Sequence, residues 1–100
     1  MQTKAELLTL LFNHKDTIKS FGVNDLGLFG SFVTGKNINK DSDVDFLIEF
    51  SPNKKTYDNF IGLTFFLEEL LGRKIELVTR ESLSPYIGPH ILKQVEHVGI

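Results

Sequence analysis

Residues 42–50 read SDVDFLIEF, and this stretch gives the strongest strand signal in the chain. Every second residue from position 44 onward is apolar, and successive side chains of a strand point to opposite faces, so the pattern predicts one buried face. The apolar positions are Val44, Phe46, Ile48 and Phe50, whereas Asp45, Leu47 and Glu49 share the other face. Asp43 and Asp45 stand two positions apart, so their carboxylates would project from the same side, roughly 7 Å apart along the backbone.

A pair of acids on one strand face has a chemical consequence. Carboxylates this close raise each other's pKa unless a cation neutralises them. Hard oxygen ligands on one face suit Mg²⁺, which commonly takes one or two carboxylates together with substrate phosphates. The alternative is a solvated strand face with two surface acids, or simple turn chemistry at Ser42 and Asp43.

Upstream of this strand, residues 25–30 read DLGLFG and predict a short buried strand that ends at Gly30. A polar connector over residues 31–42 follows. Glycine lets a backbone approach a ligand closely, and the amides that follow it can hold phosphate oxygens together with the hydroxyl of Ser31. A plain structural turn is the alternative, because glycines often end strands.

Residues 73–79 read RKIELVT and predict a third strand, in which Glu76 lies among the apolar residues Ile75, Leu77 and Val78. An acid in a central strand costs free energy unless it is exposed, paired or bound to a metal. Glu76 shares a face with Lys74 and Val78, so the residues leave a salt bridge to Lys74 and metal ligation equally open.

Helical patterns frame these strands. Thr3 and Glu6 have the spacing of a capping box and open a predicted helix over residues 3–20. A second helix is predicted over residues 56–71, before a glycine, and a last one over residues 89–95. The order helix, strand, strand, helix, strand, helix predicts an α+β fold, with a small mixed β-sheet flanked by helices.

The helix over residues 56–71 carries apolar residues on two sides. At 100° per residue, one stripe predicts the core-facing side. Its members are Phe60, Leu63, Phe66, Leu67, Leu70 and Leu71. Ile61 and Phe65 fall roughly opposite, and an exposed apolar pair of this kind marks a candidate partner interface. Burial beneath another helix of the same fold is the alternative.

Composition narrows the function classes. With 100 residues, 41% hydrophobic and 24% charged, the chain has the make-up of a single globular domain, residues 1–100. The net charge of −2 and the lack of a basic run argue against a nucleic-acid template. The absence of cysteine excludes disulfides, thiolate zinc sites and thiol nucleophiles. A polar N-terminus and the lack of a long apolar run predict no membrane association and a cytoplasmic location.

The combined pattern Gly30-Ser31, then Gly35, then Ser42-Asp43-Val44-Asp45 resembles the Gly-Ser…Asp-x-Asp signature of the DNA polymerase β-like nucleotidyltransferase superfamily. The leading helix, residues 72–79 and the tail from 83 to 98 resemble its minimal nucleotidyltransferase (MNT) group, so practically the whole chain is covered. The resemblance implies the nucleotidyltransferase fold, similar to the palm of polymerase β.

The resemblance also implies roles for individual residues. Asp43 and Asp45 would hold two Mg²⁺ ions about 3.5–4 Å apart, with ATP as the substrate. Glu76 would supply the third carboxylate, which completes the metal site and helps activate the acceptor hydroxyl. The residues expected to bind the nucleotide are Gly30, Ser31, Gly35, Lys36 and Ser42.

Members of this group that are paired with a HEPN-domain RNase act as antitoxins, which transfer AMP from ATP onto a tyrosine of the toxin. The resemblance therefore implies a cognate HEPN-domain toxin as the partner, besides the nucleoside triphosphate. Association of the chain into a homo-oligomer is left open.

The sequence departs from the family's pattern at three points. The third acid is usually Asp rather than Glu76, and Thr34 stands where an Arg often donates to phosphates. The stretch from Ser31 to Asp43 is also one residue longer than in the antitoxin group. These departures favour an alternative: a nucleotidyltransferase-like binding module that neutralises its partner by complex formation, with little catalysis. A small-molecule transferase is a weaker option, because nothing in 100 residues supplies an acceptor domain.

Overall fold

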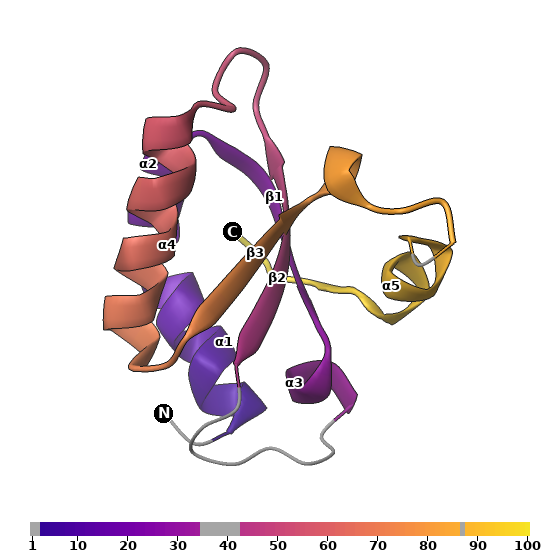
Figure 1. Ribbon diagram of the computed structural model, residues 1–100. Helices are drawn as coiled ribbons and strands as arrows, with labels where there is room; N and C mark the ends of the chain where they lie inside the picture. Colours follow the sequence, from indigo (N-terminus) through magenta and orange to yellow (C-terminus); the bar gives the residue numbers. More distant parts are fainter. Residues whose placement is uncertain (1–2, 35–42, 87) are drawn as a thin grey trace.

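The computed structural model describes residues 3–34, 43–86 and 88–100, with the side chains of Ser31 and Thr34 left out. Lys36 and the other expected nucleotide-binding residues Gly35 and Ser42 lie outside the described residues. The elements, in chain order, are α1 (Lys4–Asn13), α2 (Lys15–Ser20), β1 (Val23–Phe29), α3 (Ser31–Thr34), β2 (Val44–Phe50), α4 (Tyr57–Leu71), β3 (Ile75–Thr79), the 3₁₀ turn η1 (Arg80–Ser82), α5 (Gly88–Gln94) and β4 (Glu96–His97) (Figure 1).

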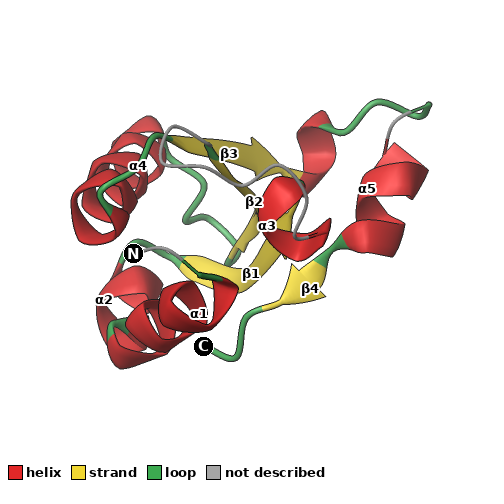
Figure 2. Cartoon of the chain, turned by 90° about the horizontal axis from the view of Figure 1, so that it is seen from below, coloured by secondary structure: helices red, strands yellow, loops and turns green. Residues whose placement is uncertain are grey.

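The sheet has the strand order β3-β2-β1-β4. β1 runs antiparallel to both β2 and β4, whereas β2 and β3 are parallel, joined by the crossover helix α4. The sheet is therefore mixed, and the predicted α+β fold is confirmed (Figure 2). Across the described residues, no helix combines the length and the apolar character needed to cross a membrane.

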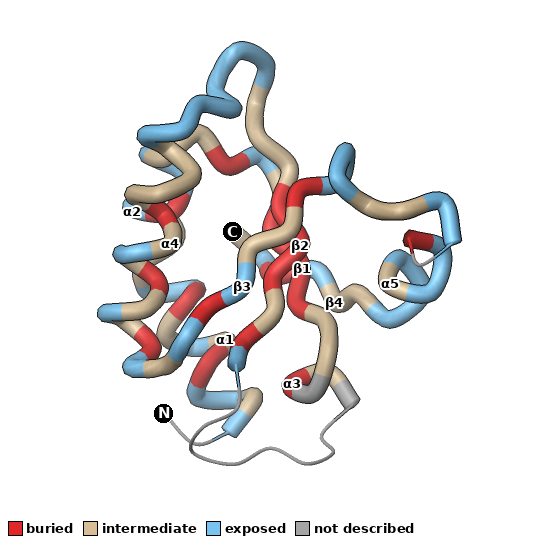
Figure 3. The backbone as a smooth tube through the Cα atoms, viewed as in Figure 1, coloured by how far each residue is buried: buried red, intermediate tan, exposed pale blue. Residues whose placement is uncertain are grey.

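Helices α1, α2 and α4 cover one face of the sheet and bury the hydrophobic core against it (Figures 1 and 3). The predicted core-facing side of β2 is confirmed at Val44, Phe46 and Ile48, which are almost completely buried. Phe50 is only half-buried, and Leu47 on the opposite side is buried as well. The predicted stripe of α4 also faces the core, with Leu63, Leu67 and Leu71 buried and its other members packed partly against them. We call the opposite side of the sheet the outer face; α3, η1 and α5 flank it.

The first predicted helix is divided in two. The hydroxyl of Thr3 accepts the N–H of Glu6 at 3.2 Å, as the N-cap prediction requires. The prediction of one helix over residues 3–20 is wrong, however, because His14 leaves the helical conformation with φ −115° and ψ 20° and separates α1 from α2. Its ring lies 6.1 Å from that of Phe66 on α4. Packing between helices therefore accompanies the bend that the sequence pattern did not show.

The other boundaries shift by a few residues. β1 begins at Val23, two residues before the predicted start, and ends at Phe29, immediately before Gly30. The start of the predicted connector is helical instead, since residues 31–34 form α3. β4 is a strand that the sequence did not predict, and it is only two residues long.

The prediction that Glu76 lies in a central strand is wrong. β3 stands at the edge of the sheet, and Glu76 is exposed on it. The salt bridge to Lys74 is also absent from the ion pairs formed by the described residues. Exposure removes the cost of burying a lone acid, so the position of Glu76 needs no pairing partner for stability.

Candidate active site

The outer face of the sheet carries the predicted acids. Strand register pairs Phe29 on β1 with Asp45 on β2, and Asp45 with Glu76 on β3. Residues in register on neighbouring strands point to the same face, with Cβ atoms about 5 Å apart. The three side chains therefore form one row across the sheet, at the end where β1 finishes and β2 begins. Asp43 lies just before β2 and is exposed.

Gly30 brings the end of β1 onto this row. It has φ +78°, in the left-handed region that favours glycine, and a Cβ at this position would overlap the carboxylate of Asp45. The close approach seen at Gly30 is to the Asp45 carboxylate, and its predicted approach to a phosphate stays a prediction. The N–H of Val33 donates to the Gly30 carbonyl at 3.0 Å, so α3 folds directly out of this turn.

Asp45 has an unusual protonation equilibrium. Its side chain is half-buried, and burial is the main cause that raises its pKa from 3.8 to about 6. The negative charge of Glu76, a side-chain hydrogen bond with Glu76 and the charge of Asp43 raise this pKa further. Without a cation, the ionised Asp45 is disfavoured because like charges crowd a partly desolvated site.

Whether these residues fit a metal ion depends on this clustering of negative charge. Asp45 has a raised pKa and lies near the negative charges of Glu76 and Asp43, and a hard divalent cation would neutralise such a set of carboxylates. In the part of the chain that the structure describes, no three acidic or histidine side chains are already arranged closely enough to hold an ion. The donor set therefore fits Mg²⁺ in kind, while its members stand more open than the ligands of a bound ion.

Of the other predicted residues, one lies beside this row and two lie away from it. The backbone of Ser31 opens α3 next to Gly30. Ile61 and Phe65 lie on α4, which packs on the opposite side of the sheet from the acids. Phe65 is 64% exposed, as expected for the face opposite the core stripe, and Ile61 is half-buried.

Two residues near the site received no role from the sequence. Phe32 on α3 is fully buried, and the guanidinium of Arg73 lies over its ring, 5.0 Å from the centroid. Arg73 comes directly after Gly72, whose left-handed conformation ends α4. The packing of Arg73 on Phe32 joins segments that are distant in the sequence, so no local sequence pattern indicates it. The apolar character of Phe32, just after Gly30-Ser31, is the one feature that could have drawn attention to this residue.

A comparison with known protein families identifies the family of this chain. The nucleotidyltransferase domain family matches residues 13–97. The chain belongs to this family. It is accordingly a nucleotidyltransferase, a transferase enzyme, and the resemblance drawn from its Gly-Ser and Asp-x-Asp motifs is confirmed.

Relatives of known name cover nearly the entire chain. The protein adenylyltransferase MntA of Thermococcus cleftensis is 38% identical over 99 residues, 98% of each chain. The candidate protein adenylyltransferase MJ1379 of Methanocaldococcus jannaschii is 32% identical over 96% of this chain and 94% of its own.

Solved structures share the fold of this nucleotidyltransferase. A candidate minimal nucleotidyltransferase superposes with a TM-score of 0.72 at 27% identity, covering 89% of this chain and 93% of its own. A toxin–antitoxin structure with AMP-PNP superposes with a TM-score of 0.68 at 19% identity, covering 87% of this chain and 71% of that one. The toxin–antitoxin MntA-HepT gives a TM-score of 0.56 at 21% identity, covering 96% and 68%.

Proposed function

We propose that this nucleotidyltransferase is an antitoxin of the cytoplasm that transfers AMP from ATP to a tyrosine hydroxyl of a cognate HEPN-domain toxin. The observation that carries the proposal is the row of Asp45 and Glu76 on adjacent strands, with Asp43 and Gly30 beside it. The relatives named protein adenylyltransferases and the toxin–antitoxin structure with AMP-PNP support the choice of donor and acceptor.

Asp43, Asp45 and Glu76 are the residues that would hold magnesium. When bound, Mg²⁺ neutralises these carboxylates and the phosphates and polarises the phosphorus that is attacked. The backbone around Gly30 and Ser31 would receive the β- and γ-phosphates, with Gly35, Lys36 and Ser42 as further proposed nucleotide contacts.

Glu76 would act on the acceptor, and its exposure at the edge of the sheet supports this role because an incoming hydroxyl could reach it there. In the proposed reaction the tyrosine oxygen forms a bond to the α-phosphorus, and the bridging bond between the α- and β-phosphates breaks. Pyrophosphate leaves with the electron pair of that bond. The phenolic proton passes to the Glu76 carboxylate, which acts as general base.

Labelled ATP tests this function directly. The purified chain is incubated with its toxin, Mg²⁺ and ATP labelled on either the α- or the γ-phosphate. Nucleotidyl transfer places the α-label on the toxin and releases the γ-label with pyrophosphate. Asp45→Asn combined with Asp43→Asn should abolish labelling, whereas Asp25→Asn should not, since Asp25 pairs with His97 at the other end of the outer face.

Each outcome of this assay has a clear meaning. Transfer of the γ-label instead of the α-label would show phosphoryl transfer and refute the proposal. Unchanged labelling by the double variant would remove the acids from the chemistry. Replacing the toxin tyrosine by Phe should leave the toxin unlabelled if tyrosine is the acceptor.

A second candidate function is neutralisation of the toxin by complex formation, with little catalysis. It is favoured by the apolar surface of Phe65 on α4, on the other side of the sheet from the acids. Ile61 lies one helical turn earlier and is half-buried, so the two residues form the proposed partner interface. Binding and chemistry would then reside on opposite sides of the molecule and could be separated by mutation.

A further inference from the structure

The side chain of Arg73 joins two segments that are distant in the sequence. Its guanidinium lies 5.0 Å from the centroid of the Phe32 ring, within the range at which a cation is attracted to an aromatic face. Phe32 is 1% exposed, and the Nε atom of Arg73 is shielded from solvent. The turn between α4 and β3 is therefore held against α3 through the contact of a half-buried Arg73 with a buried ring.

From Phe32, the contacts continue through α3 and Gly30 to Asp45. α3 has only four residues, and a helix of that length does not form without tertiary support. Phe32 is its buried anchor, and the Val33 N–H bonds to the Gly30 carbonyl at 3.0 Å. Gly30 in turn lies against the Asp45 carboxylate. A continuous series of contacts thus runs from Arg73 through Phe32 and Gly30 to Asp45.

We propose that Arg73 is a positioning residue of the nucleotide site, which fixes Gly30 and Ser31 over the acids by its stacking on Phe32. The inference rests on the proposed function, because the ligand that benefits is the magnesium nucleoside triphosphate. Arg73 acts through Phe32 and need not touch the phosphates itself.

Comparison with Lys74 separates the ring contact of Arg73 from the effect of its positive charge. It is the next residue, carries the same charge and is exposed, so its ammonium is free to attract phosphate through solvent. A compact ammonium lacks the planar face by which a guanidinium stacks on a ring. If the positive charge alone matters, the two residues should be equivalent; if stacking on Phe32 matters, only Arg73 should count.

The test measures nucleotide affinity and the order of α3 separately. Calorimetry of Mg-ATP binding to Arg73→Gln should show about a fivefold higher Kd than the native chain, whereas Lys74→Gln should stay within about twofold. Arg73→Lys should fall between the native chain and Arg73→Gln. Amide exchange at Val33 should be faster in Arg73→Gln and unchanged in Lys74→Gln. Unfolding curves confirm that each variant is folded at the temperature of the assay.

A double-mutant cycle decides whether Phe32 carries the effect. In a Phe32→Leu background, Arg73→Gln should no longer change the Kd, because the ring that it stacks on is gone. An equal effect of Arg73→Gln in both backgrounds, or an equal effect of Lys74→Gln, would overturn the inference and leave a general charge effect. Failure of the native chain to bind Mg-ATP would instead refute the proposed function, and the inference with it.

Discussion

Asp45 is the residue on which the proposed chemistry depends, and its protonation has a testable sign. Its raised pKa, about 6 against 3.8, means that the folded chain binds this proton more tightly than the unfolded chain. The stability that the proton contributes is present below about pH 4 and is lost as the pH rises towards 6. The native chain, without metal, therefore has a destabilising ionised acid at neutral pH.

Asp45→Asn should remove this destabilisation. Because Asn does not ionise, the variant should melt several degrees above the native chain at pH 7.5 without magnesium, and the difference should shrink at pH 4.5. Thermal unfolding at the two pH values measures it, with Asp25→Asn as the matched control on the same face. A variant that is less stable than the native chain at pH 7.5 would contradict the assigned electrostatics.

Replacing Gly30 should affect both stability and nucleotide binding. In Gly30→Ala, the added Cβ would stand on a residue with positive φ and would also overlap the Asp45 carboxylate. In Gly72→Ala the φ is positive too, but no atom lies within 4 Å of the added Cβ. Gly72→Ala should therefore cost only the backbone term of about 1 kcal/mol. Gly30→Ala should cost more and should also weaken Mg-ATP binding. Equal losses of stability, measured by denaturant unfolding, would mean that the Asp45 contact is unimportant.

The two sides of helix α4 differ: one packs on the core and the other exposes Phe65. Phe65→Glu changes a residue that is 64% exposed, so it should leave the unfolding midpoint and Mg-ATP affinity nearly unchanged. It should weaken binding of the toxin if the α4 surface is the partner interface. Phe12→Glu, on the exposed side of α1, is the matched control. A pull-down in which both variants bind the toxin like the native chain would remove α4 from the interface.

The elements also show what periodicity can and cannot predict. The core-facing positions Val44, Phe46 and Ile48 and the stripe of α4 follow the sequence pattern, because burial imposes these periods directly on the sequence. The bend at His14 was missed because it coincides with packing on Phe66, and α3 was missed because four residues carry no period. The edge position of β3 depends on which strands pair, and a local pattern does not encode pairing.

Only part of the candidate site could be predicted from the sequence. Asp43 and Asp45 were found from their spacing, and Glu76 from an acid in an apolar run. The direct register of Asp45 with Glu76, and the contact of Gly30 with Asp45, follow only from the assembled sheet. Arg73 could not be found at all without coordinates, since its contact with Phe32 spans about forty residues of sequence.

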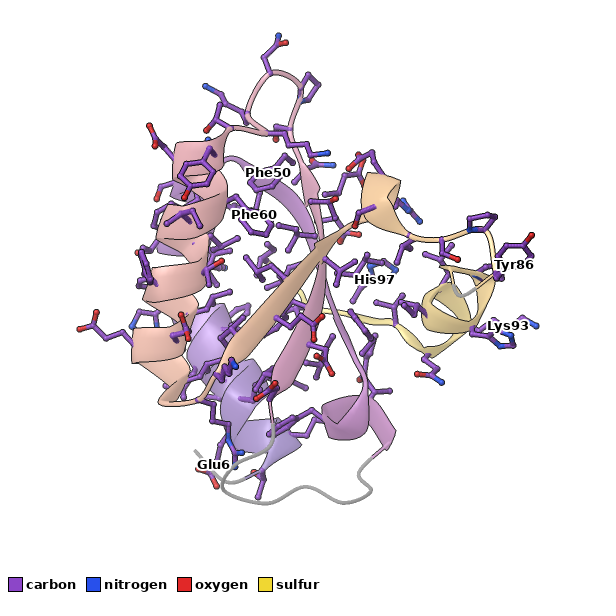
Figure 4. The ribbon with its side chains drawn as sticks, viewed as in Figure 1. Glu6, Phe50, Phe60, Tyr86, Lys93 and His97 are labelled. Atoms are coloured by element: carbon purple, nitrogen blue, oxygen red, sulfur yellow. The ribbon has the colours of Figure 1, made fainter. Side chains whose placement is uncertain are left out.

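For the molecule as a whole, the sheet separates two surfaces. The outer face carries the acids of the candidate site, while the helices on the other face bury the core and leave Phe65 exposed. Figure 4 shows the described side chains on the ribbon, in the same view as Figure 1. Under the proposed function, this separation would let a small chain combine a reactive site with a partner surface. Binding of a magnesium nucleotide is therefore the most direct measurement of the proposed site on the outer face.

Proton competition should be visible in nucleotide binding by the intact chain. Because Asp45 must be ionised to hold a cation, Mg-ATP affinity should be nearly constant above about pH 7 and should fall towards tenfold per unit below about pH 6. Titrations between pH 5 and pH 8 measure this profile. Asp25→Asn should follow the native profile, and a flat profile would show that Asp45 does not take part.

Calorimetric titration of ATP into the native chain, with Mg²⁺ and then with a chelator in its place, tests the central claim most directly. Our account predicts saturable binding with magnesium, its loss with the chelator, and its loss in Asp45→Asn even when magnesium is present. Equal binding under all three conditions, or no binding with magnesium, would contradict the claim that these acids hold a metal-bound nucleotide.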